Sequence, residues 1–415
     1  MKVLLIGSGG REHAIAWKLA QSQQVHKIYC APGNGGTAME DKCENVDITE
    51  IDGLLSFAEK NNIDITVVGP EAPLINGIAD RFKEKGLKIF GPSKKAAMLE
   101  GSKAYAKEFM KKYKVKTAAY EVFEDYKTAE EYLQSCSFPI VVKADGLAAG
   151  KGVVICNSYE EAKETIESFM IKDIFKGAGK KLVIEEYLKG FEASILAVTD
   201  GKSIIPMLSA KDHKTIYENN EGPNTGGMGA VSPNPYFTNE MYESFKHDII
   251  APTLRGIRDE NMDYIGIIFF GVMINEKGVY LLEYNVRMGD PETQAVLPLM
   301  ESDFMDIINK AINGALHNTE IAWKDRYSCC IVAASEGYPG EYNTGFSING
   351  TEKVKGKVFI AGAKKSDRGL LTTGGRVLCV TCIGNTFEEA ADKAYKEIKV
   401  IDFKGIYYRK DIGKK

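Results

Sequence analysis

Acidic, amide and basic side chains alternate in one segment near residue 285. In the segment from Val279 to Glu292, the residues Glu283, Asn285 and Arg287 occupy every second position. Because successive side chains of a β-strand point to opposite faces, these three are predicted to share one face. Carboxylate and amide oxygens suit Mg²⁺, and a guanidinium binds a carboxylate or phosphoryl oxygen through two parallel hydrogen bonds. The segment therefore predicts a magnesium and anion site.

The opposite face of the same strand is predicted to be apolar. The alternation assigns three residues to it: Leu282, Tyr284 and Val286. A half-exposed strand in any antiparallel sheet also has one polar and one apolar face. A polar stripe that binds no ligand is therefore the alternative interpretation.

Two lysines and a glycine-rich turn are candidates for binding phosphate groups. Lys143 lies within the apolar run Ile140–Ala144, where a buried ammonium group needs a partner because its desolvation is expensive. The turn that follows contains Gly150 and Gly152, and backbone N–H groups of such a turn can approach phosphate oxygens closely. Lys103, at the start of a predicted helix, adds a second cation. A hairpin whose lysine reaches the surface fits this stretch equally well.

A third candidate is the predicted strand Leu182–Glu186, which ends in the acids Glu185 and Glu186. The backbone around Leu188 could form hydrogen bonds with a purine base, and Glu192 is placed to accept from ribose hydroxyls. An edge strand with solvated acids is the equally compatible alternative.

The first hundred residues predict a parallel, doubly wound sheet, because strand and helix patterns alternate. The predicted strands are Val3–Ile6, Lys27–Ala31, Asp64–Val68 and Leu87–Phe90. Ligands of such sheets bind at the carboxyl ends of the strands. Glycine-rich turns follow three of these strands, at residues 7–12, 31–36 and 69–73, and predict a pocket for a phosphorylated small molecule.

Two common nucleotide motifs fail in this chain. Gly7 and Gly9 begin a dinucleotide fingerprint, but its third glycine falls on Glu12, and a carboxylate there would repel a pyrophosphate. The turn at residues 146–152 is one residue short of a Walker loop and has no Ser or Thr after Lys151. Nicotinamide, flavin and P-loop binding are therefore disfavoured.

The remaining patterns predict two further domains. A small α/β unit at about residues 120–190 is predicted to contain the strands Ile140–Ala144 and Val153–Cys156 and a helix at Tyr159–Met170. The last ninety residues predict a small α/β domain with strands Cys329–Ala334 and Val377–Cys382 and a helix at Phe387–Lys399. The predicted domains are residues 1–101, 102–325 and 326–415.

Bulk composition favours a cytoplasmic protein that binds small molecules. The formal net charge of −4 over 415 residues creates no general attraction for nucleic acid or anionic lipid. The run Ile265–Ile274 is half the length of a membrane span and predicts a buried strand. Eight scattered cysteines do not form a disulfide framework, and a strand places Cys379 and Cys382 on opposite faces, which disfavours a metal or redox pair.

Six motifs together carry a resemblance to a known family. They are GSGGREHA (Gly7–Ala14), PGNGG (Pro32–Gly36), GPEAPL (Gly69–Leu74), VVKADGLAAGKGV (Val141–Val153), GPNTGGMGA (Gly222–Ala230) and EYNVRMGDPE (Glu283–Glu292). Over essentially its full length the chain resembles the phosphoribosylamine–glycine ligases of the ATP-grasp superfamily. The lysine and Glu-x-Asn motifs are general to ATP-grasp folds, whereas the glycine loops narrow the resemblance to this family.

The resemblance implies a central ATP-grasp domain of two α+β subdomains, with ATP and Mg²⁺ (or Mn²⁺) as cofactors. ATP would lie between the small subdomain and the central one. The residues implied for nucleotide binding are Lys103, Lys143, Gly150, Gly152, Glu185, Glu186, Leu188 and Glu192. The implied metal ligands are Glu283 and Asn285.

The resemblance also implies the substrate and catalytic groups. Substrate contacts are expected at Gly9, Gly10, Glu71, Asp212, Lys214, Thr225, Gly226 and Arg287. The catalytic groups are expected to be Lys143, Arg287 and Asp290. Three departures bear on these contacts: Thr215 replaces a usual arginine, Phe191 replaces a usual glutamate, and Ile265–Ile274 lacks the acid of many relatives, which weakens the case for a second Mg²⁺.

The expected reaction joins glycine to 5-phosphoribosylamine in purine biosynthesis. ATP would convert the unreactive glycine carboxylate to glycyl phosphate, and the amine would then displace phosphate to give glycinamide ribonucleotide. Another ATP-grasp carboxylate–amine ligase, or a carboxylase of purine synthesis, is the nearest alternative. A non-catalytic nucleotide sensor is the alternative from another class. The chain is expected to act as a monomer.

Overall fold

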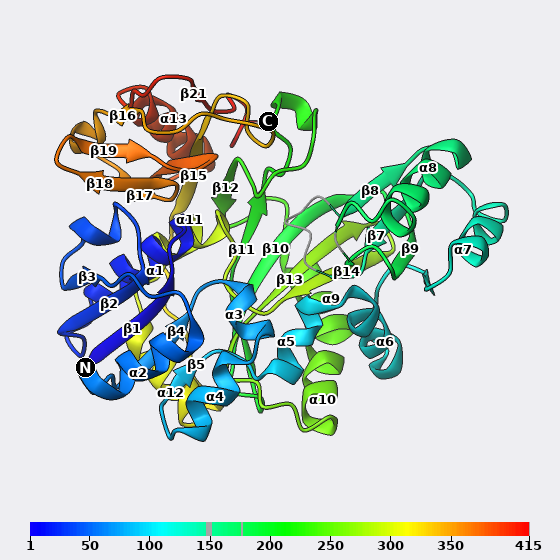
Figure 1. Ribbon diagram of the computed structural model, residues 1–415, viewed down its shortest axis with the longest axis horizontal. Coiled ribbons are helices and arrows are strands. Elements are labelled where there is room, and N and C mark those ends of the chain that lie inside the picture. Colours follow the sequence, from blue (N-terminus) through cyan, green and yellow to red (C-terminus); the bar gives the residue numbers. More distant parts are fainter. Residues whose placement is uncertain (147–151, 176, 415) are drawn as a thin grey trace.

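The computed structural model describes residues 1–146, 152–175 and 177–414. Figure 1 shows an N-terminal lobe in blue, a C-terminal lobe in orange and red beside it, and a smaller lobe on the far side of a central sheet. The α/β class predicted from the sequence is confirmed by this arrangement of mixed sheets and helices.

The N-terminal lobe contains a parallel five-stranded sheet in the order β3-β2-β1-β4-β5. The strands are β1 (Lys2–Gly7), β2 (Lys27–Pro32), β3 (Cys43–Asn45), β4 (Ile65–Val68) and β5 (Ile89–Phe90). All four predicted strands are present. The sequence did not predict β3, because its three residues are exposed or half-buried and show no apolar alternation.

Helices cover both faces of this sheet. They are α1 (Gly10–Ala20), α2 (Ile51–Asn61), α3 (Glu71–Ile75), α4 (Ile78–Glu84) and α5 (Lys94–Gly101). Val3 and Leu5 of β1 belong to the same buried cluster as Ile15 of α1. The alternate residue Leu4 belongs to a second cluster with Leu54 of α2. The doubly wound prediction is therefore confirmed.

The small lobe is an antiparallel sheet in the order β6-β9-β7-β8, covered by two helices. Its elements are β6 (Tyr120–Phe123), α7 (Tyr126–Leu133), β7 (Ile140–Ala144), β8 (Val153–Cys156), α8 (Tyr159–Met170) and β9 (Leu182–Glu186). β7, β8, α8 and β9 have the predicted bounds. The alternation of Ile140, Val142 and Ala144 supplies one apolar face, which packs with Ile166 of α8 in a separate buried cluster.

The central lobe contains long antiparallel strands and three supporting helices. Its strands are β10 (Phe191–Thr199), β11 (Ile204–Asp212), β12 (Gly229–Ser232), β13 (Gly266–Asn275) and β14 (Gly278–Asn285). The helices are α6 (Lys103–Tyr113), α9 (Asn239–Phe245) and α10 (Ala251–Asp259). β13 is buried along almost its whole length, as its continuous apolar run predicted.

A β-bulge in β14 corrects one prediction about its faces. Glu283 pairs with Gly271, but the next paired residue, Val272, faces Leu281, so Leu282 is the extra residue. Val279, Leu281 and Tyr284 are therefore the core residues of β14, whereas Leu282 is half-buried. The expectation that Leu282 faces the core is wrong, because the bulge breaks strict alternation.

The C-terminal lobe extends the central sheet. β15 (Tyr327–Ser335) pairs with β12, and β20 (Arg376–Gly384) and β17 (Lys357–Ile360) continue the sheet outward. Its other elements are β16 (Ser347–Ile348), β18 (Ala363–Ser366), β19 (Gly369–Thr372), α13 (Phe387–Ile398) and β21 (Ile406–Tyr407). Two helices precede this lobe in the chain: α11 (Glu292–Val296), and α12 (Phe304–Ile312), which contacts β5 and α1 of the N-terminal lobe. The boundary expected near residue 326 thus falls within one continuous sheet.

The two cysteines of the CxxC run behave as predicted. Cys379 lies in the buried cluster on the side of the N-terminal lobe, and Cys382 lies in the cluster beneath α13. The two thiols therefore point to opposite faces of β20 and cannot share a metal ion.

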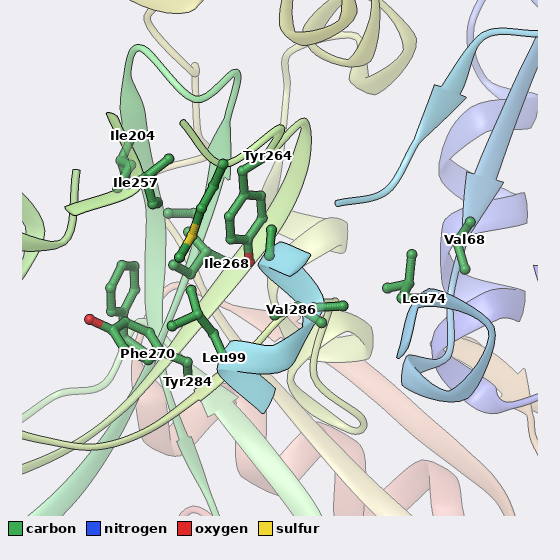
Figure 2. Packing of buried hydrophobic residues seen from close by; sticks show 14 of the residues in the cluster. Val68, Leu74, Leu99, Ile204, Ile257, Tyr264, Ile268, Phe270, Tyr284 and Val286 are labelled. Carbon is green, nitrogen blue, oxygen red and sulfur yellow. The ribbon is translucent and has the colours of Figure 1, made fainter. Parts of the chain in front are cut away.

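One buried cluster joins the N-terminal and central lobes. Figure 2 shows Val68 and Leu74 of the N-terminal lobe, Leu99 of α5, and Phe270 and Tyr284 of the central strands in this cluster. Because apolar burial is shared across the lobes, their relative position is fixed by packing. Among the described residues, no helix is long and apolar enough to cross a membrane.

His13 connects the N-terminal and C-terminal lobes. Its Nδ1 accepts a hydrogen bond of 2.8 Å from the backbone N–H of Ile360, and its Nε2 lies 3.3 Å from Oε2 of Glu40. Burial lowers the pKa of His13 below its ordinary value of 6.5, although Glu40 acts in the opposite direction. The buried imidazole is therefore neutral near pH 7.

We predict that acid weakens this connection. As the pH falls below about 6.5, the unfolded chain binds a proton at His13 that the folded chain does not, so the free energy of unfolding decreases by up to about 1.4 kcal/mol per pH unit. His13→Gln should lose less stability between pH 7.5 and 5.5 than the parent, measured by denaturant titration. His247→Gln, at an exposed histidine, is the matched control. Equal losses for His13→Gln and the parent would contradict the prediction.

Candidate functional site

Glu283, near the end of β14, is surrounded by positive charge. No side-chain hydrogen bond or ion pair of Glu283 is found among the described residues. Burial would raise the pKa of its carboxyl, but Lys214, Lys143, Lys103 and Arg287 lower it below the ordinary value. We call these four residues the cation cluster. An ionised carboxylate with free lone pairs beside several cations suits a bound metal ion and polyphosphate.

Asn285 and Arg287 lie on the same side as Glu283. Nη2 of Arg287 donates to Oδ1 of Asn285 over 3.2 Å. The guanidinium also contacts two acids: its Nε lies 3.2 Å from Oε2 of Glu71, and its Nη2 lies 2.9 Å from Oε1 of Glu100. The expected bidentate contact of Arg287 with a substrate stays a prediction. Its Nε and Nη2 already face protein carboxylates, but Nε has no hydrogen-bond partner among the described residues.

Glu100 was not expected from the sequence. Its Oε2 accepts a hydrogen bond of 2.7 Å from the backbone N–H of Val286, so it holds both the backbone and the side chain of this segment. Burial raises the pKa of Glu100, and Arg287 opposes that shift. No sequence motif contains Glu100. A glutamate at the end of a helix such as α5 is ordinarily a solvent-exposed residue, so its role could not be predicted.

Lys143 has the partner that its burial requires. Its Nζ lies 2.9 Å from Oε1 of Glu185 and 3.4 Å from the backbone oxygen of Leu282. Nζ of Lys103 donates to the backbone oxygen of Gly146 over 3.2 Å. Gly150 lies outside the described residues. Gly152 is buried, and its backbone oxygen accepts from the N–H of Ala144.

Glu185 is placed differently from its predicted role at the nucleotide. Its side chain is 2% exposed and lies between Lys143 and Lys107, with Oε2 3.1 Å from Nζ of Lys107. Its backbone is paired on both sides, with Tyr120 and Val141. A direct contact of Glu185 with the nucleotide stays a prediction, since its carboxylate faces two lysines of the protein.

The neighbouring predicted nucleotide residues lie at the edge of the small lobe. The carboxylate of Glu186 accepts from the N–H of Ala119 over 2.9 Å, and Leu188 is half-buried in the segment that leads to β10. Glu192 is exposed and forms an ion pair with Lys214. Burial would lower the pKa of Lys214, but Glu192, Glu283 and Asp212 raise it.

Acidic groups gather where β11 meets α11. Burial and the nearby carboxylate of Glu292 raise the pKa of Asp212 well above its ordinary value. Oδ1 of Asp212 is buried and has no hydrogen-bond partner among the described residues. Oγ of Ser194 donates to Oε1 of Glu292 over 2.9 Å. A buried acceptor without a donor indicates that a ligand supplies the missing proton.

The loop after β11 approaches these acids closely. Oγ1 of Thr225 donates to the backbone oxygen of Lys214 and accepts from the N–H of Gly227. Gly227 has φ +109°, and a Cβ there would lie 2.7 Å from Oδ1 of Asp212. The close approach and the positive φ explain why this position requires glycine.

A cavity of about 470 Å³ lies between the N-terminal and C-terminal lobes. Its lining includes two of the three predicted glycine turns, through Gly9 and Asn34, and also Asp290. The third turn does not line it; Glu71 of that turn contacts Arg287 instead. Gly10 is buried against Gln294 and Ala361 rather than open to the cavity.

Asp290 connects the cavity to α1 and α11. Oδ2 accepts from the backbone N–H of Arg11 over 3.2 Å, and Oδ1 accepts from Nε2 of Gln294 over 2.9 Å. Nη1 of Arg376 lies 3.3 Å from Oδ1 and donates to the backbone oxygens of Gly226 and Asp290. Despite burial, these cations lower the pKa of Asp290.

The C-terminal lobe supplies cavity residues that the sequence did not predict. They are Tyr338, Lys364, Thr373 and Arg376. The only signal for them was an arginine directly after two glycines, at residues 374–376. The other three residues lie far along the chain from the glycine turns. They reach the cavity only because β15 and β20 continue the central sheet into the C-terminal lobe.

The arrangement fits a magnesium ion held by few protein ligands. No group of three or more His, Cys, Asp or Glu side chains suited to a metal occurs in the described part of the chain. Glu283 and Asn285 offer one carboxylate and one amide oxygen. Mg²⁺ commonly takes only one or two protein ligands and keeps its other positions for water and phosphate oxygens.

Comparison with known proteins identifies the family. Three family models match successive parts of the chain: the N domain of phosphoribosylglycinamide synthetase at residues 1–100, its ATP-grasp (A) domain at 101–293 and its C domain at 328–415. A phosphoribosylamine–glycine ligase of Clostridium acetobutylicum is 64% identical over 414 residues, which is all of both chains. The chain belongs to the phosphoribosylamine–glycine ligase family.

Further relatives agree with this assignment. A phosphoribosylamine–glycine ligase of Fusobacterium nucleatum is 53% identical and covers 100% of this chain and 98% of its own. The crystal structure of the Thermotoga maritima phosphoribosylamine–glycine ligase is 36% identical, with a TM-score of 0.87 over 99% of this chain and all of that one. Members of this family are ADP-forming ATP-grasp ligases of purine biosynthesis that use ATP with Mg²⁺ or Mn²⁺.

The fold extends beyond this family. The biotin carboxylase domain of the Hydrogenobacter thermophilus 2-oxoglutarate carboxylase, solved with MgADP and bicarbonate, is 19% identical, with a TM-score of 0.73 over 98% of this chain and 91% of that one. At this identity the likeness shows a shared ATP-grasp fold and carries no conclusion about substrate.

Proposed function

We propose that the chain joins glycine to 5-phosphoribosylamine with ATP, forming glycinamide ribonucleotide, ADP and phosphate. The observation that carries the proposal is the carboxylate of Glu283, which lies inside the cation cluster and has no hydrogen bond to any side chain or backbone group that the structure describes. Such a site neutralises a polyphosphate and a developing phosphoryl group, and its positive charge needs no reorganisation during the reaction.

ATP binding is assigned to the region between the small and central lobes. Lys103 and Lys143 would contact its phosphate oxygens, since within the described part of the chain Lys143 has only Glu185 and a 3.4 Å contact to Leu282 as partners. Backbone groups near Glu186 and Leu188 would meet the adenine. Glu283 and Asn285 would hold Mg²⁺, which when bound neutralises phosphate charge. The small lobe would close over ATP and exclude water from the acyl phosphate.

The glycine ammonium is assigned to the acids at β11 and α11. Oδ1 of Asp212 is a buried acceptor without a donor, and Glu292 adds a second carboxylate close by. Two carboxylates favour the protonated ammonium, so the amine of glycine itself stays non-nucleophilic. The glycine carboxylate would then lie toward the cation cluster, where ATP phosphorylates it.

Phosphoribosylamine is assigned to the cavity between the lobes. Gly9 and Asn34 supply turns at the carboxyl end of the parallel sheet, and Lys364 and Arg376 supply positive charge for a phosphate. Asp290 lies in the same lining, from the segment that follows Arg287. Its low pKa suits it to accept a hydrogen bond from a ribose hydroxyl or from the attacking amine.

Further assignments follow from the same proposal. The enzyme is expected to act as a monomer, and its composition favours the cytoplasm. The nearest rival is a carboxylase of the same fold, and bicarbonate would replace glycine in that reaction. Asp212 and Glu292 argue against the rival, because an anionic substrate gains nothing from two adjacent carboxylates.

The deciding experiment measures ADP release from ATP and Mg²⁺ with freshly made phosphoribosylamine. We expect release only when glycine is present, together with one glycyl amide product per ADP. The Lys143→Ala chain is the control for contaminating activity. ADP that appears with bicarbonate instead of glycine would overturn the substrate assignment, and no ADP under any condition would favour a nucleotide sensor.

The metal assignment predicts the behaviour of Glu283→Gln. Loss of the charged ligand should raise the Mg²⁺ concentration for half-maximal activity by at least about tenfold. The control is Glu276→Gln, which changes an exposed acid in the turn before the same strand. A normal magnesium titration for Glu283→Gln would remove this residue from the metal site.

The cavity assignment predicts a selective effect of Lys364→Met. Removing this cation should raise the KM for phosphoribosylamine about tenfold, because a hydrogen bond to a charged group contributes roughly 1.5–3 kcal/mol. The KM for ATP should not change. Lys365→Met is the matched control, since Lys365 is the next residue of β18 and does not line the cavity. A parallel rise for both substrates would contradict the assignment.

A further inference from the structure

Lys107 is a buried cation that the reaction described above does not use. It lies one helical turn after Lys103 on α6, and its side chain is 2% exposed. A buried ammonium group is expensive unless its protons are all taken. The contacts that compensate for the burial of Lys107 therefore indicate its role.

Lys107 is held by three groups of the protein. Nζ lies 3.1 Å from Oε2 of Glu185, donates to Oγ1 of Thr117 over 2.7 Å and lies 5.5 Å from the centre of the Tyr120 ring. Its side chain is 2% exposed, so these contacts fix the ammonium group inside the protein.

Glu185 divides its two oxygens between two lysines. Oε2 faces Lys107, and Oε1 lies 2.9 Å from Nζ of Lys143 at an angle that does not form a hydrogen bond. Nζ of Lys143 donates instead to the backbone oxygen of Leu282 over 3.4 Å. The carboxylate of Glu185 therefore holds Lys143 in place by charge, and the ammonium group keeps donors for a ligand.

Lys107 also holds the strand that carries Glu283. Oγ1 of Thr117, which accepts from Lys107, donates to the backbone oxygen of Leu281 over 2.5 Å. Leu281 directly precedes the bulge residue Leu282, whose backbone oxygen faces Lys143. One ammonium therefore connects α6, β9 and the bulge of β14.

We propose that Lys107 is a positioning residue for ATP, which acts by occupying one oxygen of Glu185 so that Lys143 keeps its donors for phosphate. Without Lys107, both oxygens of Glu185 would turn to Lys143, and the ammonium would be drawn from the nucleotide. This inference rests on the proposed role of Lys143 at the phosphates. Burial lowers the pKa of Lys107 to about 8, and Glu185 opposes that shift, so the group is mainly charged at pH 7.

The test is a double-mutant cycle on ATP binding, measured calorimetrically with ATP and Mg²⁺ in the absence of the other substrates. We expect Lys107→Met to weaken ATP binding about tenfold in the parent chain and less than twofold in the Lys143→Met chain, because the first residue acts through the second. The KM for phosphoribosylamine should stay unchanged. Lys111→Met, one turn further along α6 at an exposed lysine, is the matched control.

The outcomes of the double-mutant cycle distinguish a positioning role of Lys107 from an independent one. An equal loss in both backgrounds, or no loss in the parent, would overturn the positioning role of Lys107. A parent chain that binds no ATP would instead overturn the proposed function. Should Lys107→Met not fold, Thr117→Val takes its place, with about a threefold loss in the parent and none in the Lys143→Met background; additive losses would again overturn the inference.

Discussion

The carboxylate of Glu283 lies among three ammonium groups and one guanidinium, and the lobes of the molecule meet around this group of charges. Four cations in a partly buried site repel one another unless carboxylates separate them. Separate elements provide these carboxylates: Glu185 from β9, Glu192 from β10, and Glu71 and Glu100 from α3 and α5. The site therefore retains cations for a polyphosphate. Lys143, Lys214 and Arg287 are each paired with an acid on another element, whereas Lys103 donates to the backbone oxygen of Gly146.

The short helix α11 connects this group of charges to the N-terminal and C-terminal lobes. All five of its residues are buried, and the preceding Asp290 accepts from the backbone of Arg11 in the first helix. Oγ1 of Thr381, in the C-terminal lobe, donates to the backbone oxygen of Gln294 in α11. A helix with partners on every side cannot shift without breaking buried hydrogen bonds, so the cavity and the cation cluster keep a fixed relation.

Local sequence patterns predicted a helix or strand correctly when one hydrophobic pattern continued along the whole element. β7 and β9 are short apolar runs that are buried almost throughout, and α8 buries Ala162, Ile166 and Phe169 at helical spacing, so all three have the predicted bounds. The alternation also predicted that Glu283 and Asn285 share one face of β14. It wrongly predicted that the neighbouring Leu282 faces the core. A bulge depends on the partner strand, here the step from Gly271 to Val272, and the sequence of β14 contains no signal for it.

The sequence by itself determined the doubly wound sheet, the family and the residue types of the site, because helix and strand periods, glycine turns and short motifs are local properties of the chain. Only the tertiary structure decided which charges became partners. Glu185 faces Lys107 and Lys143, Arg287 faces Glu71 and Glu100, and Arg376 enters the cavity from almost ninety residues beyond Asp290. Ion pairing depends on distance and burial after folding, and neither quantity is encoded by spacing along the sequence.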